Sequence, residues 1–384
     1  MSTTIHRTRA VLALLALAGL VLLPSAPAAE RPASTAAASA HHPGPRTSVT
    51  VYAHRGASGY RPEHTRGAYE LAAALGADYL EPDLVMTRDG VLVDRHEPEI
   101  SGTTDVAAHP EFAGRRTTKM LDGRPVTGWF VEDFTLAELR TLRAVERLPE
   151  LRQHNTLYDG LWQVPTFEET LRWRAELSRR EGRTIGIIPE IKHSTYLHAQ
   201  GLDPERALVR LVTRYGLNHR GAPLWVQSFE WTSLQRLRTR LGYRADLVFL
   251  ASGSGGPYDL AAAGHPRSYA ELLEPASLRR LARVVDGVAP TKELVIPRTA
   301  TGALGSPTTL VRDAHRAGLE VTIWTMRAEN EFLPSDLRVG LDPAAYGRAF
   351  AEDLAYLRAG VDGMFCDQPD ICVQAREMAR RAAA

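Results

Sequence analysis

The stretch VYAHRGASGYRPEHT, which begins at Val51, joins a short apolar run to groups that could do acid–base and anion chemistry. His54 and Arg55 follow the apolar residues directly, and Glu63 comes a little later. The apolar run predicts a β-strand, and the glycines that follow it suit a turn. A structural turn needs glycine but no charge, so His54, Arg55 and Glu63 are candidates for a functional site.

Two further segments place charged side chains at alternate positions of expected strands. Glu81 and Asp83 lie two residues apart in YLEPDLVMT, and Glu190 and Lys192 have the same spacing in IIPEIKH. Side chains two apart on a strand point to the same face. Proline is unusual inside a central strand, so we expect the strand to end near Pro82.

The segment LVMTRDGVLVDRH reads as two alternating arms around Asp89–Gly90, which is a strong signal for a two-residue hairpin turn. Such a turn would place Asp83 opposite His96, and Asp94 opposite Val85. Directly opposed residues share a face, with Cβ atoms roughly 5 Å apart. The hairpin therefore predicts that His96 joins the acidic residues.

Three carboxylates in one small space repel each other, each close pair by ~4 kcal/mol at an effective dielectric constant near 20. Either some of them hold protons, or a cation lies between them. All-oxygen ligands favour a hard ion, Ca²⁺ or Mg²⁺, over zinc. With such an ion, Arg55 and Lys192 leave the site a single net positive charge, which matches one phosphodiester. The imidazoles of His54 and His96, with unperturbed pKa values near ~6.5, suit proton transfer to and from the reacting oxygens.

Eight short apolar runs alternate with amphipathic stretches, and these are the elements that must position the charged residues. The expected strands are Val49–Ala53, Asp78–Met86, Thr184–Ile191, Leu224–Phe229, Asp246–Leu250, Val284–Ala289, Leu319–Trp324 and Val361–Phe365. The expected helices include Phe167–Arg180, Pro204–Tyr215, Trp231–Leu241, Ser277–Arg283, Thr308–Ala317 and Ala345–Ala359. This alternation predicts an α/β fold, a (β/α)8 TIM barrel, with a doubly wound open sheet as the alternative.

Residues 98–163 and 327–345 do not fit the alternation and are expected to be insertions, the first of them after the second strand and its hairpin. A weak helix is expected around Thr135–Arg143. Both insertions follow barrel strands, so we expect them at the C-terminal face, where barrel active sites lie. The barrel domain as a whole is expected to span residues 49–384.

The first 28 residues have a basic start, an apolar stretch from Ala10 to Leu23 and an A-x-A arrangement, which together indicate a secretory signal peptide. The alternative is a membrane anchor, but the apolar stretch is short for a span of ~20 residues, and no later segment could span a membrane. Residues 29–48 are rich in Ala, Ser and Pro and predict a flexible linker. We therefore expect a secreted or periplasmic protein. Cys366 and Cys372 could form a disulfide there, or Cys366 could be a buried strand residue.

The formal net charge is only +1, from 46 basic and 45 acidic residues. A global field that attracts nucleic acid or an anionic membrane is therefore not expected. The expected partner is a small-molecule substrate with the single negative charge that the acidic site and its cations match.

Several motifs, in this order and spacing, resemble those of glycerophosphodiester phosphodiesterases. They are AHRGASGYRPEHT, ADYLEPDLVMTRDGVLVDRHEPEISGTTDV, IIPEIK, VQSFE, TIWT and GVDGMFCDQPD. The likeness runs from about Tyr52 to Pro369, and the two insertions resemble the exported, periplasmic-type branch of the family. Three positions differ from the usual pattern: His64 stands for Asn, Glu97 for Asp, and Cys366 for Thr or Ser.

The resemblance implies a TIM barrel that cleaves phosphodiesters of glycerol to glycerol 3-phosphate and an alcohol. By the same resemblance, His54 and His96 are the acid–base pair, and a divalent cation, often calcium, lies on Glu81, Asp83 and Glu190. Further positions match groups that contact the phosphate, support the site or wall the pocket: Arg55, Lys192, Glu63, Phe229 and Trp324. Glu63 would either be linked to the metal or support Arg55.

Some alternatives stay open at this point. The alcohol could belong to a wall teichoic-type polymer, and a vicinal hydroxyl of glycerol could attack before water does. A barrel phospholipase similar to sphingomyelinase D would need an apolar rim, whereas residues 98–163 are polar. A non-catalytic exported binding protein would have no need of both His54 and His96.

Overall fold

The structure, a computed structural model, describes residues 49–383. The predicted signal peptide (1–28) and linker (29–48) lie outside the described residues. Within the described part, no helix combines the length and the apolar character that crossing a membrane requires.

Parallel strands form the centre of the fold. They are β1 (Thr50–His54), β2 (Tyr79–Glu81), β3 (Asp83–Met86), β7 (Gly186–Ile187), β8 (Glu190–Ile191), β9 (Trp225–Ser228), β10 (Asp246–Ala251), β11 (Gly287–Pro290), β12 (Glu320–Met326) and β13 (Gly363–Cys366). β2 and β3 are two halves of one strand interrupted at Pro82, and β7 and β8 are halves of another interrupted at Pro189, since β2 pairs with β7 and β3 with β8. Eight strand positions remain, and each overlaps one of the eight expected ranges.

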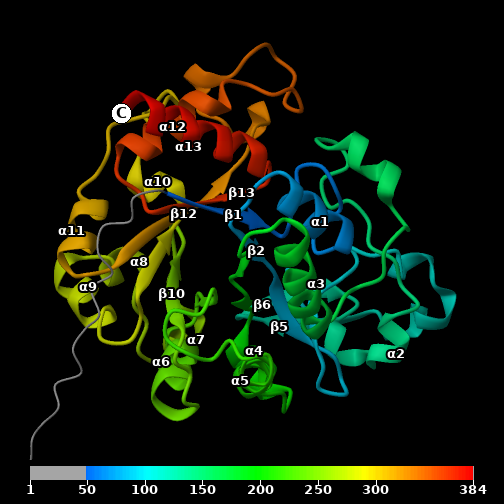
Figure 1. The fold of residues 1–384 in the computed structure, drawn as a ribbon. Coiled ribbons are helices and arrows are strands. Elements are labelled where there is room, and N and C mark those ends of the chain that lie inside the picture. Colours follow the sequence, from blue (N-terminus) through cyan, green and yellow to red (C-terminus); the bar gives the residue numbers. More distant parts are fainter. Residues whose placement is uncertain (1–48, 384) are drawn as a thin grey trace, which may run out of the picture. The chain divides into compact units, whose positions relative to one another are not determined.

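The sheet closes on itself. β1 pairs in parallel both with β2 and with β13, so the first and last strands are neighbours, drawn blue and red in Figure 1. An open, doubly wound sheet would leave both of its ends unpaired. The predicted (β/α)8 barrel is therefore confirmed.

Thirteen helices are present in the described residues, and most of them connect consecutive strands. They are α1 (Arg66–Ala74), α2 (Leu136–Leu139), α3 (Phe167–Arg180), α4 (Ser194–Ala199), α5 (Pro204–Arg214), α6 (Trp231–Arg240), α7 (Tyr258–Ala262), α8 (Tyr269–Leu272), α9 (Pro275–Leu281), α10 (Lys292–Val295), α11 (Leu310–Arg316), α12 (Ala349–Arg358) and α13 (Pro369–Ala383). Local sequence explains where several begin. In α3, for example, the Thr166 hydroxyl accepts from the Glu169 amide and the Glu169 carboxylate accepts from the Thr166 amide, a capping box.

Alternation along the strands separates an inner from an outer core. In β1, Val51 joins the large apolar cluster between strands and helices, whereas Tyr52 packs inside the barrel with Ile188 and Phe365. His54 therefore shares the inward face with Tyr52, and it stands at the carboxyl end of the strand.

The turn of the hairpin after β3 has three residues, one more than predicted. β3 pairs with β4 (Leu92–Asp94) in the register Leu84↔Asp94 and Val85↔Val93. The turn holds three residues, because the Thr87 amide donates to the Val91 carbonyl (3.0 Å) and Gly90 has φ +79°. A type I turn followed by a left-handed glycine has this form, and it uses the same Asp-Gly pair as the predicted two-residue turn.

This register differs from the prediction at two pairs. Asp94 lies opposite Leu84 and not opposite Val85. Arg95, not His96, lies opposite Asp83, and its amide donates to the Asp83 carbonyl (2.9 Å). Asp94 lies outside the barrel mouth, where its carboxylate accepts from Tyr69 Oη (3.0 Å) and Thr170 Oγ1 (2.6 Å) of the surrounding helices α1 and α3.

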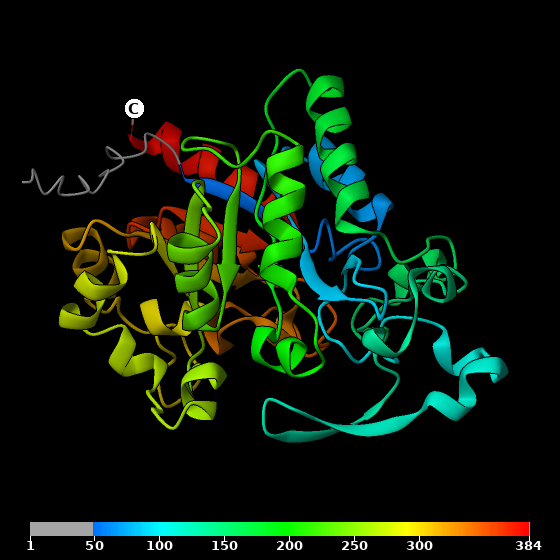
Figure 2. The same cartoon turned by 90° about the horizontal axis from the view of Figure 1, so that it is seen from below.

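Residues 98–163 fold around a second apolar cluster that includes Val85 and Val93 of the β3–β4 hairpin. The segment contains the antiparallel hairpin of β5 (Thr117–Leu121) and β6 (Arg124–Gly128), which is turquoise in Figure 2. Of the weak helix expected around Thr135–Arg143, only α2 forms. Four short 3₁₀ helices complete the segment: Val106–Ala108, Pro110–Arg115, Val131–Asp133 and Gln153–Tyr158.

Residues 327–345, the second expected insertion, are irregular apart from the 3₁₀ helices Asn330–Phe332 and Ser335–Leu337. The following helix, α12, begins at Ala349 rather than at the expected Ala345. Cys366 at the end of β13 and Cys372 in α13 form a disulfide, which answers a question that the sequence left open.

Candidate active site

One cavity of about 580 Å³ opens at the carboxyl ends of the strands. Most of the expected site residues line it: His54, Arg55, Glu81, His96, Glu190, Lys192, Phe229 and Trp324. Asp83 and Glu63 are buried beside this cavity and contact Arg55, which lies on its wall. Alternation within strands explains the convergence, because parallel strands present their last inward residues to one mouth.

Glu81, Asp83 and Glu190 form a buried acidic triad in which one possible ligand oxygen from each lies within 4.8 Å of the others. Burial and the neighbouring Asp83 raise the pKa of Glu81 well above its usual value. Burial also raises the pKa of Glu190 to about 8, although Lys192 opposes this. Asp83 is held ionised: burial disfavours its charge, but Lys192 and His96 outweigh burial and keep its pKa well below normal. Buried carboxyl groups that hold protons because of burial and mutual repulsion fit a divalent cation, which supplies the missing positive charge.

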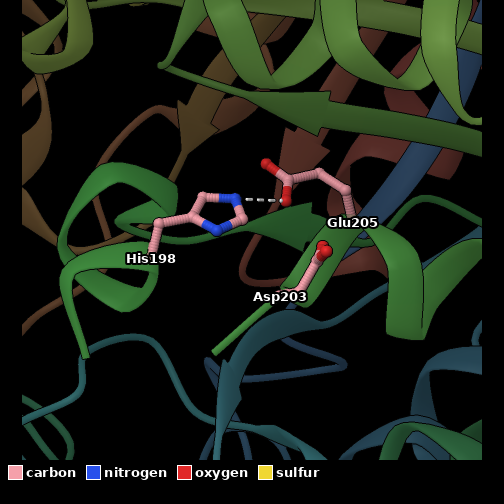
Figure 3. A group of neighbouring side chains, drawn as sticks. All are labelled: His198, Asp203 and Glu205. Carbon is pink, nitrogen blue, oxygen red and sulfur yellow. Dashed lines mark hydrogen bonds and ion pairs between the residues drawn. The ribbon is translucent and has the colours of Figure 1, made fainter. Parts of the chain in front are cut away.

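A second group of possible metal ligands comprises His198, Asp203 and Glu205 (Figure 3). Arg236 already occupies it, with Nη1 2.7 Å from an oxygen of Asp203 and 2.7 Å from an oxygen of Glu205. His198 Nε2 also contacts Glu205 Oε2 at 2.9 Å. Arg236 bridges the two carboxylates, and the group is only partly buried and lies outside the cavity. Every residue of the acidic triad is buried, and two of its members line the cavity, so the triad is the better cation site.

Two cations border the triad. Arg55 has a left-handed backbone (φ +59°), its amide donates to Glu81 Oε2 (2.7 Å), and its Nε lies 3.3 Å from Asp83 Oδ2. Lys192 Nζ lies 3.1 Å from Glu190 Oε1 and 3.3 Å from His96 Nε2. Each cation therefore lies between a metal-ligand candidate and the cavity, where it could meet a phosphate group.

His54 is held by a residue to which the sequence analysis assigned no role. Its Nδ1 lies 2.5 Å from Oδ1 of Asp367, whose Oδ2 accepts from Arg152 Nη2 (2.6 Å) and Arg327 Nε (2.8 Å). Burial and Arg55 lower the pKa of His54 to about 4, against the raising effect of Asp367. The available signal was the position of Asp367 directly after the last strand, within the motif GVDGMFCDQPD.

His96 is held in a comparable way. Its Nδ1 lies 2.9 Å from Oε1 of the adjacent Glu97. Burial, Arg55 and Lys192 lower the pKa of His96 to about 3. Both imidazoles therefore present a neutral ring to the cavity and have Nδ1 tied to a carboxylate, which leaves Nε2 for chemistry.

Glu63 and His64 support the site from behind. Glu63 Oε2 accepts from Arg55 Nη1 (2.9 Å) and from Arg147 Nε (2.8 Å), a geometry that agrees with the expected support of Arg55. His64, which stands where Asn was expected, places Nε2 2.9 Å from Asp83 Oδ2. The substituted histidine thus still contacts a triad carboxylate.

Aromatic side chains form one wall of the cavity. The rings of Phe229 and Trp324 meet edge to face, with centroids 5.6 Å apart, and Trp324 Nε1 donates to the Ala289 carbonyl (2.8 Å). A second cavity, of about 400 Å³, shares Glu190, Lys192 and Phe229 with the first and is bordered by the β5–β6 hairpin. The site therefore combines charged residues and an aromatic wall in the first cavity with a second cavity directly beside it.

Comparison of the sequence with known proteins identifies relatives that are named as phosphodiesterases. Residues 54–371 match the model of the Glycerophosphoryl diester phosphodiesterase family. A glycerophosphodiester phosphodiesterase of Arabidopsis thaliana is 34% identical over 334 residues, covering 82% of each chain, and one of Haemophilus influenzae is 28% identical over 84% of this chain and 88% of its own.

Solved structures agree on the fold. A glycerophosphoryl diester phosphodiesterase structure from Silicibacter pomeroyi superposes with a TM-score of 0.60 at 22% identity, covering 87% of this chain and 95% of its own. An Oleispira antarctica phosphodiesterase, solved with the product sn-glycerol-3-phosphate, gives 0.54 at 20% identity, covering 86% and 97%. From the family match and the relatives together, this chain belongs to the glycerophosphoryl diester phosphodiesterase family, a family of phosphodiester-hydrolysing enzymes.

Proposed function

We propose that this protein hydrolyses glycerophosphodiesters to glycerol 3-phosphate and an alcohol, with a divalent cation and two histidines. The observation that carries the proposal is the shared cavity: His54 and His96 line it together with Glu81 and Glu190 of the acidic triad. Family membership and the names of the relatives support the substrate class.

Glu81, Asp83 and Glu190 would hold the cation. Ca²⁺ is favoured over Mg²⁺ because Mg²⁺ keeps several waters and usually binds only one or two carboxylates, whereas Ca²⁺ accepts more protein oxygens. When bound, the ion supplies charge stabilisation for a phosphate oxygen. Arg55 and Lys192 add positive charge on the same side, which favours a substrate with one negative charge and stabilises the charge that grows during the reaction.

The two imidazoles divide the proton transfers. One takes a proton from the attacking hydroxyl through Nε2, and the other gives a proton to the leaving alkoxide. Both are neutral without substrate, since burial and nearby cations lower the pKa values of His54 and His96. A phosphodiester brings negative charge into the cavity, which raises these pKa values and lets one ring bind its proton.

The attacking hydroxyl belongs to water or to the neighbouring carbon of the glycerol. The same two histidines serve both routes. A cyclic glycerol phosphate that accumulates during turnover would identify the second route, and its absence from rapidly quenched reactions would identify direct attack by water.

The predicted signal peptide supports a secreted or periplasmic location, where glycerophosphodiesters and teichoic-type polymers are both candidate substrates. Expression of the full chain with a C-terminal tag, followed by fractionation, checks this. Tagged protein of full, uncleaved length inside the cell would contradict export.

The decisive assay measures glycerol 3-phosphate released from glycerophosphocholine in the presence of Ca²⁺ or Mg²⁺. We expect release by the wild type, its loss on chelation, and a fall in kcat of at least a hundredfold for His96→Ala. His198→Ala is the matched control, because His198 also pairs with a carboxylate but lies outside the cavity. Wild-type turnover that persists in excess chelator, or in His96→Ala, would contradict the proposal.

A further inference from the structure

A chain of four ionisable side chains connects His96 to the β5–β6 hairpin. His96 Nδ1 lies 2.9 Å from Glu97 Oε1, and Glu97 Oε2 lies 2.8 Å from His193 Nε2. His193 Nδ1 in turn lies 2.7 Å from Oδ2 of Asp122. Asp122 stands at the tip of the hairpin, between β5 and β6, so the tip of the insertion folds back and reaches His96 through three contacts.

The two members of this chain that lie farthest from His96 adopt an uncommon backbone conformation. His193, directly before α4, and Asp122 both have φ +46°, in the left-handed region that non-glycine residues seldom occupy. At Asp122 the two-residue turn Asp122–Gly123 accounts for it, because Leu121 pairs with Arg124 and a turn of this kind needs positive φ at both central residues. His193 belongs to no hairpin turn, and such a conformation persists where the surrounding structure imposes it. Both ring nitrogens of His193 face carboxylates in this arrangement.

Hydrogen-bond chemistry then assigns the protons. Ionised carboxylates only accept, so an imidazole between two of them donates from both nitrogens and is a cation. Burial works against this charge, but the hydrogen bonds to Asp122 and Glu97 raise the pKa of His193 to about 9. A cationic His193 keeps Glu97 ionised. Because an ionised carboxylate can only accept a hydrogen bond, His96 must donate to it, and the proton of the neutral ring therefore sits on Nδ1. His96 consequently presents unprotonated Nε2 toward Lys192 Nζ, 3.3 Å away.

We propose that His193 and Asp122 are positioning residues that fix the ring orientation and the tautomer of His96 through Glu97. The insertion hairpin is then a working part of the active site, in addition to bordering the second cavity. This inference rests on the proposed function, because it assigns the two residues a part in the same reaction.

A purely structural role is the competing explanation: the pair could simply fasten the hairpin to the barrel. The two roles differ in what they change. If the pair only attaches the hairpin to the barrel, its loss lowers the melting temperature, or it alters substrate binding beside the hairpin and so raises KM. Loss of positioning lowers kcat with KM nearly unchanged, because the orientation of His96 matters at the proton-transfer step.

The test uses His193→Asn and Asp122→Asn in the full-length enzyme, with glycerophosphocholine as substrate and saturating Ca²⁺. Asparagine tolerates the left-handed backbone, so both variants should fold, and a thermal melt checks this. We expect kcat to fall about tenfold for His193→Asn, the low end of the tenfold to hundredfold loss that follows removal of the direct partner of a metal-bound histidine, because His193 acts on His96 only through Glu97. Asp122→Asn should cause a smaller fall, and KM should stay within about twofold for both.

A double-mutant cycle tests whether the effect passes through Glu97. In a Glu97→Gln background, His193→Asn should lower kcat no further, since the connection is already broken. His198→Asn is the matched control, because it removes a histidine–carboxylate contact from α4, the helix that His193 directly precedes, without touching the chain to His96. Its kcat should equal that of the wild type.

The outcomes separate two failures. If the wild type releases glycerol 3-phosphate but His193→Asn and Asp122→Asn keep kcat within twofold, the positioning role is wrong and the proposed function stands. Independent effects of Glu97→Gln and His193→Asn would also overturn it, as would a rise in KM alone. If the folded wild type releases no product with any divalent ion, the proposed function itself fails.

Discussion

Binding of a divalent cation to Glu81, Asp83 and Glu190 should release between one and two protons per ion at pH 7. Without a cation, burial raises the pKa of Glu190 to about 8, so roughly ten of every eleven molecules carry that proton at pH 7. The pKa of Glu81 is also raised well above normal, by burial and by Asp83. A cation replaces these protons, because a carboxylate must ionise to become a ligand.

The size of the effect follows from the spacing of the oxygens. Possible ligand oxygens of the triad lie within 4.8 Å of each other. At that separation, two like charges repel by about 3.5 kcal/mol at an effective dielectric constant near 20, which raises the pKa of one carboxyl by about 2.5. Burial raises it further, and the attraction of Lys192 for Glu190 offsets part of this. Repulsion alone thus raises the pKa of one triad carboxyl from 4.5 to about 7, and burial accounts for the further rise of the Glu190 pKa to about 8.

The sign of the pH dependence follows. The folded, ion-free protein keeps the Glu190 proton up to about pH 8, whereas the unfolded chain loses it near pH 4.5. The folded state therefore binds more protons between these values, and its free energy of unfolding falls as pH rises from 4.5 to 8, by at most about 5 kcal/mol. The cation removes this penalty, so Ca²⁺ should raise the melting temperature more at pH 8 than at pH 5.

Isothermal titration of Ca²⁺ into chelator-treated protein, in two buffers of equal pH and different ionisation enthalpy, counts the protons directly. Apparent affinity should also rise by roughly ten- to a hundredfold per pH unit between pH 6 and 7. Glu190→Gln should release about one proton fewer than the wild type. Calcium binding with no proton release, and with an affinity independent of pH, would refute this account of the triad.

Three further changes are expected to have measurable effects. Asp367→Asn should lower kcat about a hundredfold with little change in KM, because it removes the anion that holds His54 Nδ1; steady-state rates equal to those of the wild type would contradict that role. Replacing Cys366 and Cys372 together by serine should lower the free energy of unfolding by about 2 kcal/mol, given the short loop that the disulfide closes; urea denaturation measures this, and an unchanged midpoint would argue against the bridge. Burial raises the pKa of Asp94 to about 7, so the folded state loses stability as pH rises from about 4 to 7; Asp94→Asn should flatten the pH dependence of urea midpoints, and an unaltered slope would show that Asp94 is not its source.

The periodicity of the sequence predicted the barrel strands and several helices closely. Residues Phe167–Arg180, for example, form α3 over the predicted range, since amphipathic spacing and a capping box at Thr166 both act locally. The β3–β4 register was predicted wrongly by one residue. Asp89–Gly90 suits both a two-residue and a three-residue turn, and only packing on both faces of the hairpin selects between them.

The sequence by itself determined which residue types stand at the ends of the barrel strands, and hence the acidic triad and the two histidines, because strand period and strand order follow from local pattern. Only the tertiary structure decided which groups hold those residues. Asp367 meets His54 across 313 positions of the chain, and Asp122 reaches His193 across 71. Asp367 meets His54 because closure of the barrel pairs β13 with β1, and Asp122 reaches His193 because the insertion hairpin folds back onto the barrel. Both contacts join segments distant along the chain, so no local pattern in the sequence specifies them.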